Sequence, residues 1–282
     1  DHLRGFPAKE QVARWLRAGV IEKGQFAPTN EGTPQGGVVS PLLMNIALHG
    51  IEDAAGVRYK PWRSTRGWSE PGPPVLIRYA DDLVALCHSR QQAEQVKERL
   101  TVWLAPRGLS FNEDKTRIVH LSEGFDFLGF NVRHYPEPGK LLIKPSKAAV
   151  KRFRARLRAE VRSLHGANAA AVISRLNPIL RGWSEYYRTA VSKKVFADVD
   201  ATLWWLLFKW GRRQHNRKTG RWITDRYFGR FHPKRQDRWV FGDRDTGAYL
   251  RKLSWTPIRR HQMVKADAST DDPELTDYWQ QR

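Results

Sequence analysis

Cysteine, long apolar runs and a charged leader are scarce or missing in this sequence of 282 residues. The single cysteine, Cys87, excludes an internal disulfide and a cysteine-rich zinc site. No stretch approaches the roughly 18 consecutive apolar residues of a membrane span, and the first residues do not form a charged-then-apolar signal. These absences predict a reducing, cytoplasmic setting and no membrane partner.

Acidic residues are also few, and they are unevenly distributed. The chain holds 49 Lys/Arg against 29 Asp/Glu, a formal net charge of +20. Residues 136–282 carry +18 of this charge, with 32 basic and 14 acidic residues, and they hold eight of the twelve tryptophans. An anionic membrane and a nucleic acid both attract such a surface. Cations interleaved with planar side chains favour nucleic acid, through phosphate contact and base stacking.

Apolar spacing predicts an α+β fold with a mixed first half and a helical second half. Runs rich in β-branched and aromatic residues predict four strands: Val75–Tyr79, Leu83–Cys87, Ile118–Leu121 and Phe125–Val132. Apolar residues at 3–4 spacing predict helices at 6–20, 40–47, 91–104, 170–188 and 197–213. Residues 60–74 are expected to form a loop. A hairpin, a helix and further strands are typical of half of a ferredoxin-like sheet with helices.

The most basic predicted helix begins after Ser146, a residue type that favours the N-cap position. An apolar stripe runs along it from Val150 to Leu164. Its other faces hold one acid, Glu160, and seven basic residues: Lys147, Lys151, Arg152, Arg154, Arg156, Arg158 and Arg162. One face can therefore pack while the others meet phosphates. A basic helix that is merely solvated is the alternative.

Two adjacent carboxylates, Asp81 and Asp82, stand between short apolar runs. Such hard oxygen ligands suit Mg²⁺, which keeps one or two carboxylates together with phosphate oxygens. The alternative is a solvated structural turn, and the pair alone favours this alternative because short motifs often match by chance.

Three further segments lie at fixed places around this pair. Residues 32–43 spell Gly-Thr-Pro-Gln-Gly-Gly-Val-Val-Ser-Pro-Leu-Leu, in which paired glycines allow close backbone approach and Gln35 offers an amide. Residues 108–116 place Lys115 where it can meet a phosphate, and residues 125–130 predict a buried strand with a glycine bulge. Each segment alone has an ordinary explanation: a loop before a helix, a solvated lysine and a core strand.

In this order and spacing, the four segments resemble the later sequence blocks of reverse transcriptases, and group II intron-encoded proteins match best. The resemblance continues in Arg181–Tyr187, Trp210–His215 and Arg221–Phe228, which are similar to the maturase-specific region of that family. It covers about residues 20–265. The resemblance implies a partial polymerase palm followed by a mainly helical thumb and maturase domain. The implied division is 1–135 for the later palm, 136–265 for the basic RNA-binding thumb/maturase region and 266–282 for an acidic linker or tail.

The resemblance also implies roles for single residues. Asp81 and Asp82 would be the catalytic, Mg²⁺-binding carboxylates. The nucleotide and template pocket would comprise Gln35, Gly36, Gly37, Tyr79, Ala80 and Lys115. The primer end would be supported by Phe127, Leu128, Gly129 and Phe130. RNA would bind the seven basic residues of the helix after Ser146, together with Arg212 and Arg213.

The implied partners are intron RNA, an RNA template with a DNA primer or target, and deoxynucleoside triphosphates. Two departures limit the implied activity. The family's third palm carboxylate, in an Asp-x-x-x-x-Phe-Asp-like stretch, has no match here, and Asp1-His2-Leu3 resembles the segment just after it. The fingers region and the Cys/His endonuclease domain have no match either. We therefore expect an RNA-directed DNA polymerase and splicing cofactor that is inactive as this chain alone.

Two alternatives stay open. One is a non-enzymatic RNA-binding maturase that retains the carboxylates without activity. The other is a reverse transcriptase of a retron or CRISPR-type system, which the segments 181–187 and 210–228 disfavour.

Overall fold

A computed structural model of the chain describes residues 5–22, 24–28, 40–58, 72–137, 139–260, 264 and 272–281. The fold is α+β, as expected, and it divides into two compact units. Of the described residues, unit 1 comprises those up to 118 together with 264 and 272–281, and unit 2 comprises those from 119 to 260. Within the described ranges, no helix is long and apolar enough to cross a membrane.

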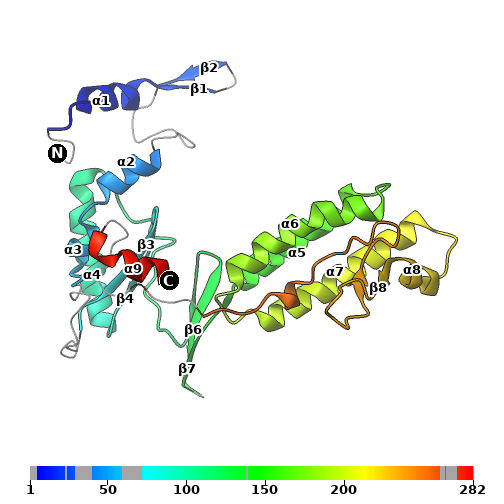
Figure 1. Ribbon diagram of the computed structural model, residues 1–282. Coiled ribbons are helices and arrows are strands. Elements are labelled where there is room, and N and C mark those ends of the chain that lie inside the picture. Colours follow the sequence, from blue (N-terminus) through cyan, green and yellow to red (C-terminus); the bar gives the residue numbers. More distant parts are fainter. Residues whose placement is uncertain are drawn as a thin grey trace. The chain divides into compact units, whose positions relative to one another are not determined.

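Unit 1 has a small core formed by the segment 48–57, one face of a β-hairpin and a helix (Figure 1). On that helix Val96, Leu100 and Leu104 recur every four residues and are buried, so they form one apolar stripe. The Ser89 hydroxyl caps the same helix by accepting a hydrogen bond from the backbone N–H of Gln92. The elements are α1 (Lys9–Arg17), β1 (Val20–Glu22), β2 (Gln25–Ala27), α2 (Ser40–Ala47), α3 (Ile51–Ala55), β3 (Val75–Tyr79), β4 (Asp82–Leu86), α4 (Arg90–Leu104), η1 (Ala105–Arg107), η3 (Pro273–Leu275) and α9 (Thr276–Gln281).

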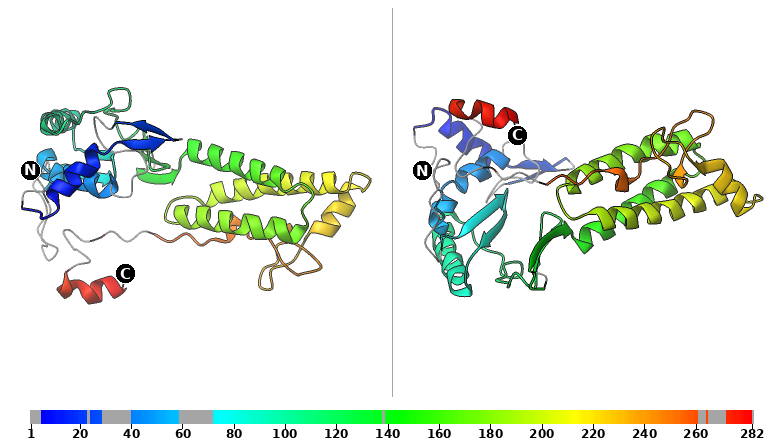
Figure 2. Two further views of the ribbon diagram at one scale, coloured as in Figure 1. Left: turned by 90° about the horizontal axis from the view of Figure 1, so that it is seen from above. Right: turned by 60° about the horizontal axis from the view of Figure 1, so that its bottom comes forward.

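Unit 2 begins with a three-stranded antiparallel sheet and continues into three long helices that run alongside one another (Figures 1 and 2). Its core takes apolar residues from each long helix, among them Leu157, Leu176 and Leu207, which are almost fully buried. The elements are β5 (Phe125–Phe127), β6 (Phe130–Tyr135), β7 (Lys140–Pro145), α5 (Lys147–Ser163), α6 (Ala169–Tyr187), α7 (Lys193–Gln214), α8 (Gly220–Tyr227), β8 (Phe228–Gly229), β9 (Val240–Phe241) and η2 (Leu253–Trp255).

Most of the predicted helices are confirmed within a few residues, but two predicted strands are wrong. Residues 118–121 form no strand: the Leu121 carbonyl oxygen accepts a backbone hydrogen bond from the N–H of His134, but no ladder of paired residues forms there. The run 125–132 is two strands, because the chain reverses at Leu128-Gly129. The strands of the described ranges form separate two- and three-stranded sheets instead of one ferredoxin-like sheet.

Several predicted features lie outside the described residues or stay predictions. Gln35, Gly36 and Gly37 lie outside the described residues, as do residues 60–71 of the expected loop. The expected boundary at residue 135, between the palm and the thumb/maturase region, rests on charge and motifs, whereas the compact units follow backbone packing. This functional boundary stays a prediction. In the expected acidic tail, residues 273–281 form η3 and α9, and Leu275 is buried.

Candidate metal-binding hairpin and nucleic-acid surface

The Asp81-Asp82 pair lies at the tip of the hairpin formed by β3 and β4. The strands are antiparallel with Tyr79 opposite Asp82, so the connecting turn is Ala80-Asp81 and Asp82 is the first residue of β4. Both carboxylates are exposed. The predicted tight hairpin is confirmed, with β4 beginning one residue earlier than expected.

The turn is strained, and an arginine from β3 supports it. Ala80 has a φ of +55°, a left-handed conformation that costs a non-glycine residue on the order of 1 kcal/mol or more. The Arg78 guanidinium donates to the Ala80 carbonyl oxygen at 3.2 Å and to Asn45 Oδ1 on α2 at 2.9 Å. These bonds join the turn to α2. Asn45 could not be predicted from a local pattern, because it lies 33 residues from Arg78 in the sequence.

Strand alternation sets which side chains accompany the carboxylates. Leu76 faces the core of unit 1, so Val75, Ile77 and Tyr79 lie on the opposite face, where they are 50, 44 and 66% exposed. Asp82 lies on this second face because it pairs with Tyr79. The hairpin therefore places one carboxylate beside an exposed tyrosine ring and an open apolar strip.

The donor set of the hairpin fits part of a Mg²⁺ site. Mg²⁺ takes six oxygen ligands and usually binds proteins through one or two carboxylates, with phosphates and water completing the set. Two adjacent exposed carboxylates meet that need. Across the described ranges, no group of three or more His, Cys, Asp or Glu side chains is placed to hold a metal ion.

Lys115 lies in a tight turn of unit 1. Asn112 organises this turn: its side-chain oxygen accepts from the Lys115 N–H at 3.2 Å, and its carbonyl oxygen accepts from the Thr116 N–H at 2.9 Å. Leu109 and Phe111 pack against the core of unit 1 just before the turn. The Lys115 side chain is exposed. The motif thus supplies an anchored turn that leaves its lysine open to an anion.

In unit 2 the predicted primer-support segment meets the motif Arg181–Tyr187. The turn between β5 and β6 consists of Leu128 and Gly129, with φ of +48° and +80°. Tyr186 Oη donates to the Leu128 carbonyl oxygen at 2.8 Å, and Tyr187 Oη donates to that of Gly129 at 3.2 Å. The Phe130 ring contacts both tyrosine rings at centroid distances of 5.1 and 4.9 Å. The two motifs therefore form one packed joint, and the primer role of Phe127–Phe130 stays a prediction.

This joint predicts that Gly129→Ala destabilises the protein by about 2 to 3 kcal/mol, because a Cβ there would lie 2.7 Å from Tyr187 Oη in a left-handed backbone. Gly166→Ala is the matched control, with φ of +84° and nothing within 4 Å, and should cost only about 1 kcal/mol. Urea unfolding measures both. Equal losses of stability in the two variants would show that Tyr187 does not pack tightly against Gly129.

The basic helix predicted after Ser146 is α5, and the predicted cap is confirmed because Ser146 Oγ accepts from the Ala149 N–H at 3.1 Å. Phe153, Leu157 and Val161 are buried. Six of the seven basic residues are exposed and Arg154 is half-buried. Glu160 binds Arg175 of α6 at 2.8 Å, and this hydrogen bond lowers the pKa of the Glu160 carboxyl. The only acid of α5 is thus occupied, which leaves the outer faces of the helix strongly positive.

The maturase-like motifs mostly build the core of unit 2. Trp183 stacks on Phe153 with centroids 4.4 Å apart. Trp210 is buried, and its Nε1 donates to the Leu164 carbonyl oxygen at 2.9 Å. These tryptophans therefore have packing roles, although tryptophans of this half were expected to stack on bases. Arg212 and Arg213, at the end of α7, are exposed as a nucleic-acid contact requires.

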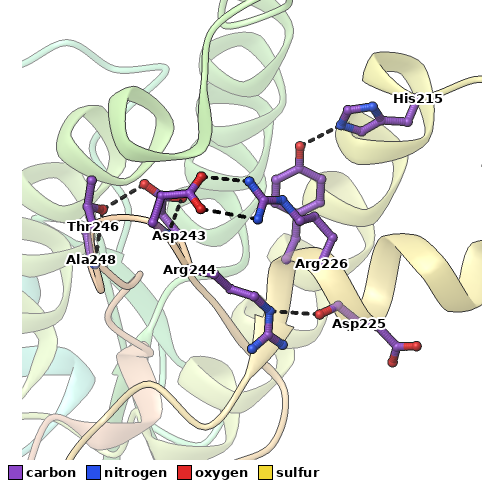
Figure 3. A network of polar contacts seen from close by, with 9 residues as sticks. His215, Asp225, Arg226, Asp243, Arg244, Thr246 and Ala248 are labelled. Carbon is purple, nitrogen blue, oxygen red and sulfur yellow. Dashed lines mark hydrogen bonds and ion pairs between the residues drawn. The ribbon is translucent and has the colours of Figure 1, made fainter.

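A polar network fixes α8 to the segment that follows it (Figure 3). His215 Nε2 and Tyr227 Oη lie 2.7 Å apart and join two of the motifs. Arg226 pairs with Asp245 at 2.7 Å, and this hydrogen bond lowers the pKa of the Asp245 carboxyl. Arg244 Nε donates to the Asp225 carbonyl oxygen at 2.9 Å. The network thus supports the end of unit 2 that carries Arg212 and Arg213.

Two family models match the chain, one over the Asp81-Asp82 hairpin and one over most of the basic helix α5. Residues 2–132 match "Reverse transcriptase (RNA-dependent DNA polymerase)", and residues 150–228 match "Group II intron, maturase-specific domain". The hairpin of Asp81 and Asp82 falls in the first match, and the basic helix α5 falls almost wholly in the second.

Three curated proteins illustrate the similarity. Protein YkfC of Escherichia coli (strain K12) is 36% identical over 135 residues, which cover 40% of this chain and 35% of that protein. Group II intron-encoded protein LtrA of Lactococcus lactis subsp. cremoris is 25% identical over 182 residues, covering 46% and 30%. Maturase-like protein 1 of Euglena longa is 25% identical over 152 residues, covering 53% and 28%. The chain spans about a third of the length of these relatives.

Proposed function

Because this chain belongs to the group II intron family of reverse transcriptases and maturases, we propose that it forms the later palm and the thumb/maturase region of an RNA-directed DNA polymerase that also assists splicing of its intron RNA. One observation carries the proposal. An exposed carboxylate pair on a strained hairpin lies within the polymerase match, and a strongly basic helix lies in the maturase match of the same chain.

For catalysis, Asp81 and Asp82 would hold Mg²⁺, which would supply positive charge to stabilise the transition state as a primer 3′-hydroxyl displaces pyrophosphate. The strained Ala80 turn, tied by Arg78 to α2, keeps both carboxylates presented to solvent. The exposed Lys115 ammonium binds the triphosphate of the incoming nucleotide, and Gln35, Gly36, Gly37 and Tyr79 shape its pocket.

For RNA binding, the positive faces of α5 and the end of α7 contact the phosphates of intron RNA and of the template–primer duplex. The support is the partition of charge: residues 136–282 hold +18 of the +20, and the buried stripe of α5 leaves its cations outside. We propose that residues 1–135 serve polymerisation, that residues 136–265 serve RNA binding, and that the acidic residues 266–282 act as a linker or tail.

The 282-residue chain by itself should show little or no DNA synthesis on a primed RNA template. Two carboxylates without a third hold the metal ions weakly and in poor geometry. Primer extension with Mg²⁺ and all four deoxynucleotides measures this. Robust extension would contradict the assignment and would place the third carboxylate within the chain.

A second, longer protein serves as the positive control for this test. The same chain extended upstream to an Asp-x-x-x-x-Phe-Asp block should regain synthesis. Both samples should bind RNA equally in salt titrations, since binding is assigned to α5 and α7. If the extended protein binds RNA but makes no DNA, the non-enzymatic maturase alternative is favoured.

A further inference from the structure

Two tryptophans of unit 2 are exposed, although other aromatic side chains of this unit, such as Phe196 and Trp210, are buried. Trp205 on α7 is 57% exposed, and Trp239, just before β9, is 54% exposed. Trp204 joins them: its ring contacts Trp205 at a centroid distance of 4.9 Å and Trp239 at 5.9 Å, both edge-on. We call these three residues the tryptophan patch. Open indole rings leave a large apolar area in water, which is unfavourable unless a partner covers it.

The patch rests on a firm support. The Trp204 ring stacks on the Phe208 ring, with a centroid distance of 5.4 Å and an interplanar angle of 8°. Its centroid lies 5.2 Å from that of Phe228. Trp204 and Trp239 also line a small surface hollow together with Phe228 and Lys252. Beside it, the Asp200 carboxylate accepts from the backbone N–H groups of Leu253 and Ser254 at 2.8 and 2.9 Å, which fixes the neighbouring loop. The rings are therefore held in place before any partner arrives.

The surroundings of the patch are positive. Residues 200–260 hold 16 Lys/Arg and five Asp/Glu. Each of these acids is already engaged: Asp200 by backbone N–H groups, Asp225 by Arg221, Asp237 by Trp255 and Lys252, Asp243 by Thr246 and Asp245 by Arg226. By contrast Lys209, Arg212 and Arg238 are exposed, and no ion pair involves them among the described residues. The net field around the rings thus favours an anion.

We propose that the tryptophan patch binds unpaired RNA, with one or two bases stacked on Trp205 and Trp239 and the backbone phosphates near Lys209, Arg212 and Arg238. Exposed aromatic rings on a strongly basic segment are the chemistry that single-stranded nucleic acid requires, since every base has a π-face. Bases within a duplex already stack on one another and offer no free face. The proposal rests on the proposed RNA-binding function and adds a separate subsite, on α7 and the segment before β9.

The test compares Trp205→Leu and Trp239→Leu with Trp205→Phe in the full chain. Leucine keeps an apolar surface but lacks a π-face, whereas phenylalanine keeps one. Fluorescence anisotropy with a labelled unstructured RNA and a blunt RNA duplex, each at several salt concentrations, measures affinity. We expect each leucine variant to bind the unstructured RNA roughly tenfold more weakly. Trp205→Phe should lose much less, and duplex binding should not change.

Salt dependence separates this site from the phosphate contacts. Loss of a stacked base should lower affinity by the same factor at every salt concentration, because no counterion release is lost. Equal weakening for both RNAs, or wild-type affinity in the leucine variants, would overturn the subsite while leaving the salt-dependent RNA binding of the proposed function intact. Failure of the wild-type chain to bind either RNA would overturn both. Equal loss of affinity for the unstructured RNA in Trp205→Leu and Trp205→Phe would indicate that the size and shape of the indole matter, and would overturn base stacking.

Discussion

Replacing Asp81 or Asp82 with asparagine should lower DNA synthesis by on the order of a thousandfold or more, in a protein that joins this chain to an upstream Asp-x-x-x-x-Phe-Asp block. Asparagine keeps the size of the side chain but removes the charge that holds a divalent cation. Metal ions contribute several kcal/mol to such a displacement, and each 1.36 kcal/mol is a factor of ten in rate. Steady-state primer extension on RNA measures the loss.

The matched control is Asp114→Asn, which makes the same change at another exposed carboxylate of unit 1. It should leave synthesis within about twofold of the wild type. RNA affinity should stay unchanged in all three variants, since binding is assigned to unit 2. Similar losses at Asp81, Asp82 and Asp114 would mean that surface charge, and not a metal site, explains the effect.

Reversing Arg152, Arg154, Arg156 and Arg158 to glutamate should weaken RNA binding by roughly a hundredfold or more near 0.1 M salt. Each lost phosphate contact removes about 0.7 to 0.9 from the slope of log affinity against log salt, so the slope should flatten by about three. Filter binding or anisotropy over a salt series gives both quantities. Circular dichroism shows whether α5 still folds, which we expect because its buried stripe is untouched.

A charge-matched control separates location from net charge. Arg14, Arg17, Arg99 and Arg117 are exposed residues of unit 1, and their reversal changes the net charge by the same amount. We expect a loss of less than about fivefold and little change of slope, since long-range fields are screened within about 10 Å at this salt. If both sets weaken RNA binding alike, the partition between the units is mistaken.

Periodicity was sufficient to predict the long helices and the hairpin that carries Asp81 and Asp82. The stripe containing Phe153, Leu157 and Val161 repeats every four residues, and these residues are buried in α5. Val75–Tyr79 and the apolar run after Asp82 are short and β-rich, and only two residues separate the strands. Local sequence determines these features, so a local pattern was enough to find them.

Features that depend on tertiary contacts could not be predicted. The run 125–132 has no polar turn pair, and the reversal at Leu128-Gly129 is held by two tyrosines 58 residues away in sequence. The sequence of a strand also does not indicate which sheet it joins, so the separate sheets could not be predicted.

The sequence also did not show which tryptophans are exposed to solvent. Trp204 and Trp205 are adjacent, but a helix turns about 100° per residue, so one ring meets the core and the other faces water. Counting tryptophans therefore overestimated the surface available to bases, because Trp210 lies in the core and Trp183 packs against it.

Iron-directed cleavage tests the assignment of the Asp81-Asp82 hairpin most directly. Fe²⁺ in place of Mg²⁺ generates hydroxyl radicals with ascorbate and peroxide, and these cut the backbone next to the bound ion. In the chain joined to an upstream Asp-x-x-x-x-Phe-Asp block, with a deoxynucleoside triphosphate present, we expect cuts at residues 79–83 that excess Mg²⁺ suppresses and that Asp81→Asn and Asp82→Asn abolish. Cleavage elsewhere in the chain, or cleavage at the hairpin that persists in both variants, would contradict a polymerase metal site at this turn.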